Sequence, residues 1–421
     1  MGRAESAPRG ARGLTSIDPA RRSLLADPTY LKIWLIGLFW GVVRWLELLA
    51  FGVYAFDLTG SPFLVAFLVV LRFLPLAAFG VIFGAFADLA SPLRLMTGAT
   101  AAMALASLGF YLIFGYGEPT FAHIAAAAFL SGTFWACDLP FRRKLIGELA
   151  APERLSSAMA LDASTSNGTR MLGPLIGGVL YEFVGIDGVF ALSAALYAVA
   201  AGLGFAIPRS AEPETRAGPG RVARAFAGVG EAARYAVRDG DVFRILMVTV
   251  AFNIWGFPYL AMVPVIGKDE LGLSPSQIGA VTALEGLFAL IGAVVMTRAA
   301  NPRRFRAIYF GAVCALFATI LVMGLAPGFW TLAIGLCLGG FCAAAFAVMQ
   351  STLIYMVAPP GMTGRFLGLM TISIGTGVIG FANIGLTADV VGGSQALVVI
   401  ALESIPAMIA IAWGWSRLRT G

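Results

Sequence analysis

Charged side chains are scarce along this chain. They make up 12% of its 421 residues, whereas hydrophobic residues make up 59% and the mean hydropathy is +0.86. Soluble domains carry about 25% charged residues, and a soluble chain of this length would need polar surfaces for two or three domains. The composition therefore excludes a soluble protein and requires an apolar solvent, which a lipid bilayer provides.

Histidine and paired cysteine are equally scarce. His123 is the single histidine, and the cysteines at positions 137, 314, 337 and 342 fall within apolar segments. No two of them form a metal-type CxxC pair, and a cysteine in such a segment usually serves as a small packing residue. We therefore expect no metal site, no cofactor, no nucleophile–base pair and no enzymatic activity.

The absence of a nucleotide-binding motif and of a basic soluble domain argues against two other classes of partner. The Gly-x-x-x-x-Gly-Lys-[Ser/Thr] motif that cradles nucleotide phosphates does not occur, which excludes ATP coupling within this chain. The net charge of +6 would indicate a nucleic-acid partner only if basic residues clustered on a folded soluble face. No segment could form such a domain, so we expect no nucleic-acid partner.

What the sequence does contain is a series of long apolar runs. Each has roughly 20 residues or more, the length of a helix that crosses a bilayer, and none alternates as a membrane strand would. They predict an all-α integral membrane protein with twelve transmembrane helices. The expected spans are 33–56, 62–87, 94–115, 119–139, 156–182, 187–207, 243–266, 276–298, 305–326, 329–358, 364–388 and 394–416.

Most of the 29 basic residues fall on one side of these spans. They lie in the N-terminal arm, the even-to-odd connections, the central polar stretch and the tail, whereas the opposite loops hold only Lys268. Basic residues in short loops stay cytoplasmic, so both termini are predicted to be cytoplasmic. The basic collar would face anionic lipid head groups. We expect a multi-pass protein of the bacterial inner membrane.

One long polar stretch divides the chain. Residues 208–242 are rich in proline, glycine and alternating charge, which is typical of a linker. Its second part, from about Arg221 to Val237, has a helical spacing that would let it lie along the membrane surface. The expected organisation is a cytoplasmic arm (1–31), a six-helix half (32–207), a cytoplasmic linker (208–242), a second six-helix half (243–416) and a cytoplasmic tail (417–421).

The two halves repeat each other weakly. Leu145–Pro152 matches Leu353–Pro360, and Gly178–Gly185 matches Gly385–Gly392, at offsets of 208 and 207 residues. Parallel six-helix repeats with a binding site at their interface characterise one large class of transporters.

Two motifs resemble those of the major facilitator superfamily. Gly84, Asp88 and Arg94 resemble its loop motif after the second helix, and Asn167–Gly178 resembles the glycine-proline motif of its exporters. Together with Arg72–Pro75 and Pro152–Leu155, they look most like the branch that holds enterobactin-type siderophore exporters and macrolide-efflux pumps. The resemblance covers roughly residues 30–415 and implies the major facilitator fold.

The resemblance also implies roles for several of these residues. In the family, groups such as Asp88 and Arg365 latch the two halves together on the cytoplasmic side. The glycine-proline motif marks exporters and limits leak through the closed state. Close helix packing explains its small residues equally well. The motif residues are Gly173, Pro174, Gly177 and Gly178.

Polar and charged residues inside the spans form the candidate site. A charge in the bilayer costs about 2.5–3.5 kcal/mol on insertion scales, so each one needs a structural or functional reason. The candidates for proton coupling or for lining the cavity are Arg44, Glu47, Arg72, Asp162, Asn167, Arg170, Glu285 and Glu403.

Arg44 and Glu47 share one face of the first span, at spacing i, i+3. They could form a static ion pair that fixes this helix. Alternatively, Glu47 carries a proton, because low dielectric favours its neutral form while Arg44 or Arg72 favours its charged form. A carboxyl that changes charge as water enters from either side would couple proton flow to alternating access. Both interpretations stay open.

The other candidates also allow more than one interpretation. Glu285 has no basic residue in its own span, so it is either a neutral acid bonded to a neighbouring helix, a group facing water, or a residue that handles substrate. Glu403 could instead bond to Ser404 or to a carbonyl near Pro406. Asn167 and Arg170 could line a cavity or tie their helix to its neighbours. We expect Asp138 to pair locally with Arg142 or Arg143 of the following connection.

These features predict a proton-coupled secondary transporter that exports a hydrophobic or amphipathic small molecule, such as a drug, siderophore or metabolite, by alternating access. Aromatic residues in the first, fourth and seventh spans would suit such a substrate, and multidrug antiport is the expected activity. We expect a monomer whose partners are this substrate, protons and membrane lipid. The alternatives are a lysophospholipid flippase of the same fold and a non-transporting scaffold or sensor, which would have little need of charges in the membrane.

Overall fold

The computed structural model describes residues 24–89, 91–150, 154–208, 221–298, 302–359 and 362–416. The predicted tail, most of the predicted N-terminal arm and the first part of the linker lie outside these residues. Every element in the described part is helical.

The first half of the chain, which we call the N half, contains six long helices. Asp27 caps the first of them, because its carboxylate accepts from the backbone N–H groups of Thr29 and Tyr30, and Gly60 ends it in the left-handed region. The helices are α1 (Pro28–Thr59, preceded by the short η2, Leu24–Ala26), α2 (Pro62–Leu89), α3 (Pro92–Tyr116), α4 (Phe121–Leu149), α5 (Leu155–Phe183) and α6 (Ile186–Phe205).

The linker contains the amphipathic helix α7 (Arg221–Arg238), and the C half follows it. The first span of the C half is interrupted: it runs through α8 (Gly240–Ala251), the π turn η5 (Phe252–Gly256), α9 (Tyr259–Val265) and the π turn η6 (Ile266–Glu270). The remaining elements are α10 (Pro275–Arg298), η7 (Pro302–Arg304), α11 (Phe305–Leu325), α12 (Phe329–Val357), α13 (Thr363–Gly375), α14 (Gly377–Val391) and α15 (Gly393–Ser416).

Eleven spans in the described part are long and apolar enough to cross a membrane. The twelfth predicted span is α5, which has the length but carries a polar run from Ser164 to Arg170. The predicted ranges agree with the helices to within a few residues, with one large exception. The sequence ends the fourth span at residue 139, whereas α4 continues to Leu149 and buries Arg142, because this arginine bonds to carboxylates inside the N half.

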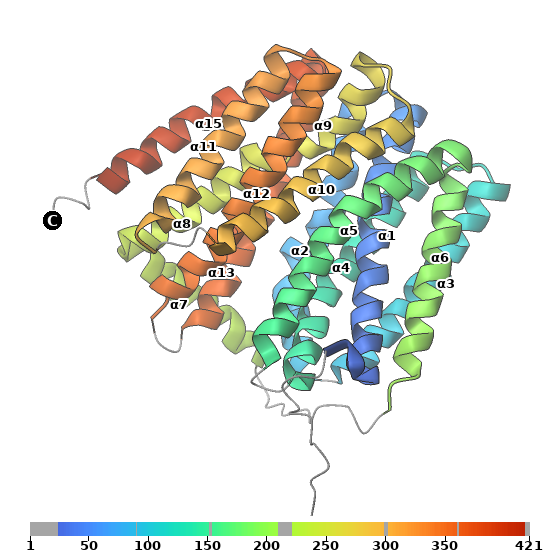
Figure 1. Cartoon of the computed structure of the whole chain (residues 1–421), viewed down its shortest axis with the longest axis horizontal. Helices are drawn as coiled ribbons and strands as arrows, with labels where there is room; N and C mark the ends of the chain where they lie inside the picture. The colour runs from blue at the N-terminus through green and yellow to red at the C-terminus, as the bar shows by residue number, and fades with distance from the viewer. Residues whose placement is uncertain are drawn as a thin grey trace, which may run out of the picture.

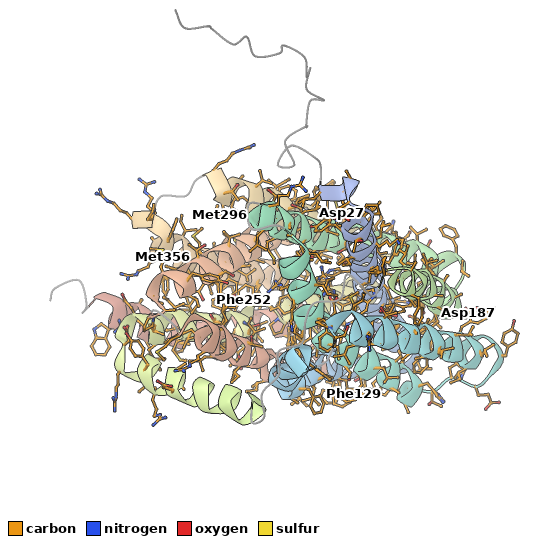
Figure 2. All side chains as sticks on the ribbon, turned by 90° about the horizontal axis from the view of Figure 1, so that it is seen from below. Asp27, Phe129, Asp187, Phe252, Met296 and Met356 are labelled. Atoms are coloured by element: carbon orange, nitrogen blue, oxygen red, sulfur yellow. The ribbon has the colours of Figure 1, made fainter. Side chains whose placement is uncertain are left out.

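The two halves stand side by side (Figure 1). Seen from below, Met296 and Met356 of the C half lie on one side and Asp187 of the N half on the other (Figure 2). Two long helix pairs join the halves, α5 with α10 and α2 with α14. We call the end that carries α7 and the start of α1 the near end, and the opposite end the far end. The near end is the one predicted to be cytoplasmic.

Apolar contacts fill both the halves and the seam between them. The ring of Phe73 on α2 lies 5.5 Å from that of Phe381 on α14, which places a shared aromatic core between the halves. On the outer surface, side chains such as Leu105 and Ile409 are 70% and 63% exposed. A lipid solvent permits apolar residues both in the interior of the protein and on its outer surface. Burial alone therefore does not locate a functional site in this protein, whereas the polar contacts do.

Candidate functional site

Helix α5 is packed directly against one helix of each half through its glycines. A Cβ on Gly177 would lie 2.7 Å from the carbonyl oxygen of Leu46 on α1, and a Cβ on Gly173 would collide with Trp45 of the same helix. A Cβ on Gly178 would collide with the carbonyl oxygen of Pro275 on α10. The glycines therefore let the α5 backbone touch α1 and α10 with no side chain between them.

The α10 side of this seam is built in the same way. A Cβ on Gly279 would lie 2.5 Å from the carbonyl oxygen of Pro174, and one on Gly286 would lie 2.5 Å from the backbone nitrogen of Met171. Helices that approach this closely bring side chains at the same level within hydrogen-bonding reach.

Arg170 and Glu285 meet at this level and connect the two halves. Arg170 Nε donates to Glu285 Oε2 at 2.7 Å, and its Nη2 donates to Oε1, so the contact is bidentate. The Arg170 guanidinium also lies 5.1 Å from the centre of the Trp45 ring. Glu285 is 2% exposed. Planar, two-point pairing of this kind is the strongest ion-pair geometry available to arginine.

A small cleft of about 40 Å³ lies beside the Arg170–Glu285 pair. Its walls come from both halves: α1 and α5 on one side, and α9 and α10 on the other. The lining is apolar and aromatic except for the ion pair and one threonine, and consists of Trp45, Leu48, Leu49, Arg170, Pro174, Leu260, Val263, Pro264, Thr282 and Glu285.

Glu47 lies in a second polar cluster, inside the N half. The side chain is 1% exposed and accepts a hydrogen bond of 2.6 Å from Ser131 Oγ of α4. The ion pair between Arg44 and Glu47, one of the two interpretations of the sequence, is not formed. Instead, Arg72 of α2 comes within 3.9 Å of Glu47 and donates to the Arg44 carbonyl oxygen at 2.7 Å, while the Arg44 guanidinium lies 5.3 Å from the Trp135 ring centre.

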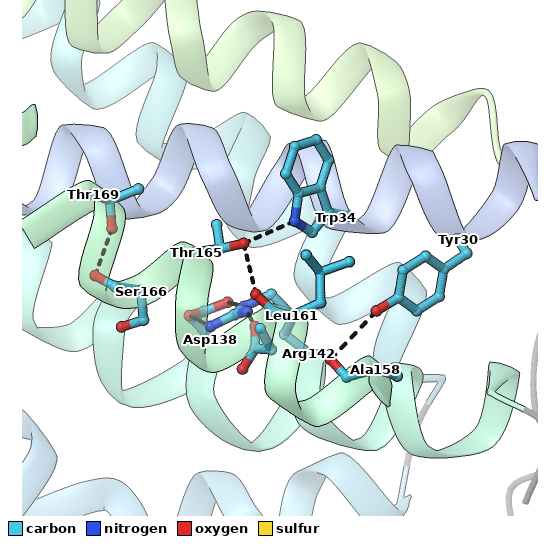
Figure 3. Close-up of polar contacts among 10 residues, drawn as sticks. Tyr30, Trp34, Asp138, Arg142, Ala158, Leu161, Thr165, Ser166 and Thr169 are labelled. Atoms are coloured by element: carbon cyan, nitrogen blue, oxygen red, sulfur yellow. Dashed lines mark hydrogen bonds and ion pairs between the residues drawn. The ribbon is translucent and has the colours of Figure 1, made fainter. Parts of the chain in front are cut away.

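A third cluster lies toward the near end, where Arg142 of α4 binds two carboxylates. Its Nε donates to Asp138 at 2.9 Å, as expected for this local pair, and its Nη1 pairs with Asp162 of α5. Figure 3 shows this contact beside two bonds from α1 to α5: Trp34 Nε1 to Thr165 Oγ1 at 2.8 Å, and Tyr30 Oη to a backbone carbonyl. Asp162 therefore joins α5 to α4 rather than facing the cleft between the halves.

Polar contacts between the halves also gather at the far end. Lys268 of the C half pairs with Asp57 of α1, whose other oxygen accepts from Tyr181 Oη at 2.7 Å. The Ser276 backbone N–H of α10 donates to Glu182 at 2.8 Å. Ser61, which directly precedes α2, donates to Asp389 of α14, also at 2.7 Å. In this conformation the far end is therefore held closed by contacts at three places of the N half.

A buried bidentate pair across two six-helix halves, with a closed far end, is an arrangement suited to alternating access. Comparison with known proteins identifies the family. The family model of the Major Facilitator Superfamily matches residues 33–324, which is more than half of the chain. This chain belongs to the Major Facilitator Superfamily. It is therefore a secondary transporter and not an enzyme, and it is a multi-pass membrane protein.

Two curated relatives of this superfamily member are efflux proteins. It is 21% identical over 321 residues to macrolide efflux protein A of Streptococcus pyogenes, covering 75% of this chain and 78% of the relative. It is 26% identical over 280 residues to the enterobactin exporter of Shigella flexneri, covering 66% of this chain and 62% of that exporter. The resemblance drawn from the sequence motifs is thus confirmed.

Solved structures agree with the fold of this superfamily member. A bacterial homologue of the human lysosomal transporter Spinster matches with a TM-score of 0.72 at 12% identity, over 92% of this chain and 97% of that one. The human organic anion transporter MFSD10 matches with a TM-score of 0.64 at 16% identity, over 94% and 100%. The predicted all-α membrane fold of twelve helices in two halves is confirmed.

The loop-motif residues of this superfamily member lie at the near end. Gly84 and Asp88 fall in the last part of α2, where the side chains lie outside the described residues. Arg94 begins α3. Arg365 of α13 pairs at 2.5 Å with Glu231 of α7, which ties the linker helix to the C half.

Glu403 and Asn167 complete the candidate set. Glu403 accepts from Asn383 Nδ2 at 2.7 Å and from Trp255 Nε1 at 3.1 Å, rather than from Ser404, and it is exposed on α15 away from the Arg170 cleft. Asn167 lies half-buried on α5, one turn before Arg170.

Three functional contacts of the site were not predicted from the sequence. Ser131 gave no signal, because a lone serine in an apolar run is common. The cross-half partner of Glu285 did leave a signal: Glu285 had no base in its span, and Arg170 was an arginine without an assigned partner in the other half. The far-end lysine, Lys268, was the single basic residue that the sequence placed in the loops opposite the basic collar.

Proposed function

We propose that this transporter exports a hydrophobic or amphipathic small molecule and is driven by protons. The observation that supports this proposal most strongly is the Arg170–Glu285 pair, since it crosses the seam between the halves inside an apolar cleft. A transporter that moves its halves around such a cleft must either keep or break this pair in each cycle.

Breaking the pair has a physical requirement. A buried charge left without its partner is strongly unfavourable, so separation of the halves near α5 and α10 needs a compensating charge. A proton on Glu285 would neutralise the acid and weaken its hold on Arg170. A donor or cationic group on the substrate would compete with that proton for the ionised carboxylate of Glu285. Proton binding and substrate binding would thereby exclude each other, which is the basis of antiport.

Glu47 is the second proton-carrying group of the proposal. It is buried, it accepts a single 2.6 Å bond from Ser131, and Arg72 stands 3.9 Å away, beyond direct hydrogen-bonding distance. A carboxyl in this setting has only one distant countercharge to hold it ionised. Protonation therefore needs no large rearrangement, and a proton could be taken up or lost as water reaches the site from one side or the other.

The lining of the cleft supports an amphipathic substrate. Apart from the ion pair and Thr282, the walls are aliphatic, proline and tryptophan side chains. Such a surface offers few hydrogen bonds to a sugar but a large apolar contact area to a hydrophobic molecule. The two efflux relatives agree with this substrate class, although they share only 21% and 26% of their aligned residues with this chain.

Everted membrane vesicles provide the test, because export then becomes uptake. Vesicles that contain the protein should accumulate members of a panel of fluorescent amphipathic compounds and lysophospholipids, and a protonophore should abolish the accumulation. Uptake confined to lysophospholipids would favour the flippase alternative. If no compound or lysolipid accumulates above empty-vector vesicles while the protein is present in the membrane, the proposed activity fails.

The coupling residue is tested in the same vesicles with Glu47→Gln. We expect gradient-driven uptake to disappear, whereas exchange of labelled for unlabelled substrate continues, because exchange needs no net proton movement. Glu270→Gln is the matched control, since the hydrogen bonds of Glu270 within the described part go to Ser394 of the same half. Full gradient-driven uptake by Glu47→Gln would remove Glu47 from the mechanism.

A further inference from the structure

A groove on the outer surface of the C half lies between α8 and α15. Its volume is about 420 Å³, against about 40 Å³ for the cleft beside the Arg170–Glu285 pair. Helix α15 lies on the side of the C half that faces away from the N half (Figure 1). Phe243 on one wall is 41% exposed and Ala410 on the other wall is exposed as well. The groove therefore opens to the surrounding lipid and not to the seam between the halves.

Small residues on α15 leave this space open. Ala407 and Ala410 both line it and share one face of the helix, because they are three positions apart. Along the other wall, the groove extends from Arg244 past Met247 to Trp255, eleven residues further on, which corresponds to about 16 Å of helix. The hydrocarbon core of a bilayer is about 30 Å thick, so the groove has the depth of one leaflet.

Arg244 is the single charged residue among the described residues that line the groove, and it lies at the end nearest α7. Its Nη1 is buried and meets no acceptor in the described part of the chain. Two nearby acids are already engaged: Asp241 pairs with Arg306 of α11 at 2.5 Å, and Asp239 accepts from the backbone N–H groups that begin α8. An arginine without a countercharge in apolar surroundings is costly, so its position indicates a ligand that carries a negative charge.

Trp255, in the π turn η5, marks the opposite end of the groove. Its indole N–H donates to Glu403 of α15 at 3.1 Å, and Glu403 also accepts from Asn383 of α14 at 2.7 Å. These bonds fix the ring between the two walls. Glu403 itself does not line the groove. The groove thus has a cation at the near end and an aromatic surface near the middle of the bilayer.

We propose that this groove binds one anionic phospholipid from the leaflet at the near end. Arg244 pairs with the phosphate, and an acyl chain lies along Met247 toward Trp255. The arrangement fits a lipid, because phosphates lie at the surface of the hydrocarbon core while acyl chains point toward its centre. A free phosphate would use Arg244 alone and leave the apolar length of the groove empty.

A second outer groove offers an internal comparison. It lies between α11 and α15 and has a similar volume, about 390 Å³, but no charged residue lines it within the described part. It should therefore accept acyl chains without regard to the charge of the head group. The preference for an anionic lipid should belong to the groove beside Arg244.

Thermal unfolding of the purified full-length protein in detergent tests the site without measuring transport. Phosphatidylglycerol should raise the melting temperature in a saturable way, and further than phosphatidylcholine of the same chains, whose head group has no net charge. Arg244→Gln should raise the phosphatidylglycerol concentration for half the effect by about tenfold, as expected for a lost hydrogen bond between charged groups. Ala410→Trp fills the groove from an exposed position and should abolish the preference for phosphatidylglycerol.

Two matched variants make the result specific. Arg298→Gln removes another near-end arginine, which ends α10 and does not line the groove, and Ala318→Trp fills the second groove. Both should keep the preference for phosphatidylglycerol. Equal stabilisation by the two lipids, or an equal loss of preference in Arg298→Gln, would assign the effect to the basic surface as a whole and overturn the proposal.

Two other occupants would also be recognised. Glycerol phosphate has the charge of the head group but no acyl chains, and stabilisation equal to that by phosphatidylglycerol would show a site for free phosphate instead. A dimer in detergent that Ala410→Trp converts to a monomer, measured by light scattering, would place a second copy of the chain in the groove. Either result would overturn the proposal.

Discussion

The two halves of this transporter hold their helices together with different polar contacts. Inside the N half, Arg44, Arg72 and Arg142 are placed among Glu47, Asp138 and Asp162. Inside the C half, the buried polar contacts of α8, α11 and α12 are neutral: Gln350 donates to Thr249 Oγ1 at 3.0 Å, and Thr249 bonds to Tyr309 Oη at 2.8 Å. Both networks tie a first helix to its neighbours.

The difference shows that charge is not needed to build a half of this fold. A neutral network holds three helices of the C half together, and an ion pair in a low-dielectric interior often stabilises no better than apolar residues of the same size. We propose that the charges around Glu47 have a reason other than packing, namely proton handling. The C half contributes Glu285, whose partner is supplied by the N half.

The strongest test of this contrast removes one member from each network. Arg142→Met leaves Asp138 and Asp162 buried without their partner, and should destabilise the protein by about 3–5 kcal/mol or more. Tyr309→Phe removes two neutral hydrogen bonds, to Thr249 Oγ1 and to the Ile245 carbonyl oxygen, and should cost only about 1–2 kcal/mol. Unfolding in mixed micelles, followed by tryptophan fluorescence, measures both. Equal losses would mean that the two networks serve the same structural purpose.

The pair between the halves should behave differently from either network. Arg170→Met alone should cost about 3–5 kcal/mol, because Glu285 is then buried and unpaired. Adding Glu285→Leu should recover most of that loss, within roughly 1 kcal/mol, since apolar side chains can fill the same space. We expect the double variant to fold, to melt near the unmodified protein and to lose gradient-driven uptake. A double variant that still transports would assign the pair to stability alone.

The smallest effect on stability is expected at the far end. Lys268 and Asp57 are each about a third exposed, so Lys268→Met should change the free energy of unfolding by only about 0–1 kcal/mol. It should nevertheless shift the halves toward opening at that end. Spin labels on the far ends of α1 and α10 would report longer distances by pulsed electron resonance. Unchanged distances would show that Ser61–Asp389 and the glycine seam keep this end closed without the lysine.

The sequence predicted the helices well and their contacts poorly, for one physical reason. Hydropathy is a local property, so the twelve spans could be placed from it. The Arg170–Glu285 bond joins residues 115 positions apart and depends on how the halves dock. Arg142 was assigned to a loop because a charge normally ends an apolar run. Its partner Asp162 lies on the next helix, and the local pattern gives no sign of that pairing.

Helix α5 has a consequence for how the protein is made. Among the predicted spans in the described part, α5 alone is not apolar enough to be expected to cross a membrane, so its insertion into lipid by itself would be unfavourable. The preceding helix can assist insertion, because Arg142 of α4 neutralises Asp162 of α5 if the two helices leave the translocon together as a hairpin. Arg170 has no such early partner, because Glu285 lies on α10, which is synthesised more than a hundred residues later. The N half would therefore remain beside the insertion machinery until the second half delivers Glu285.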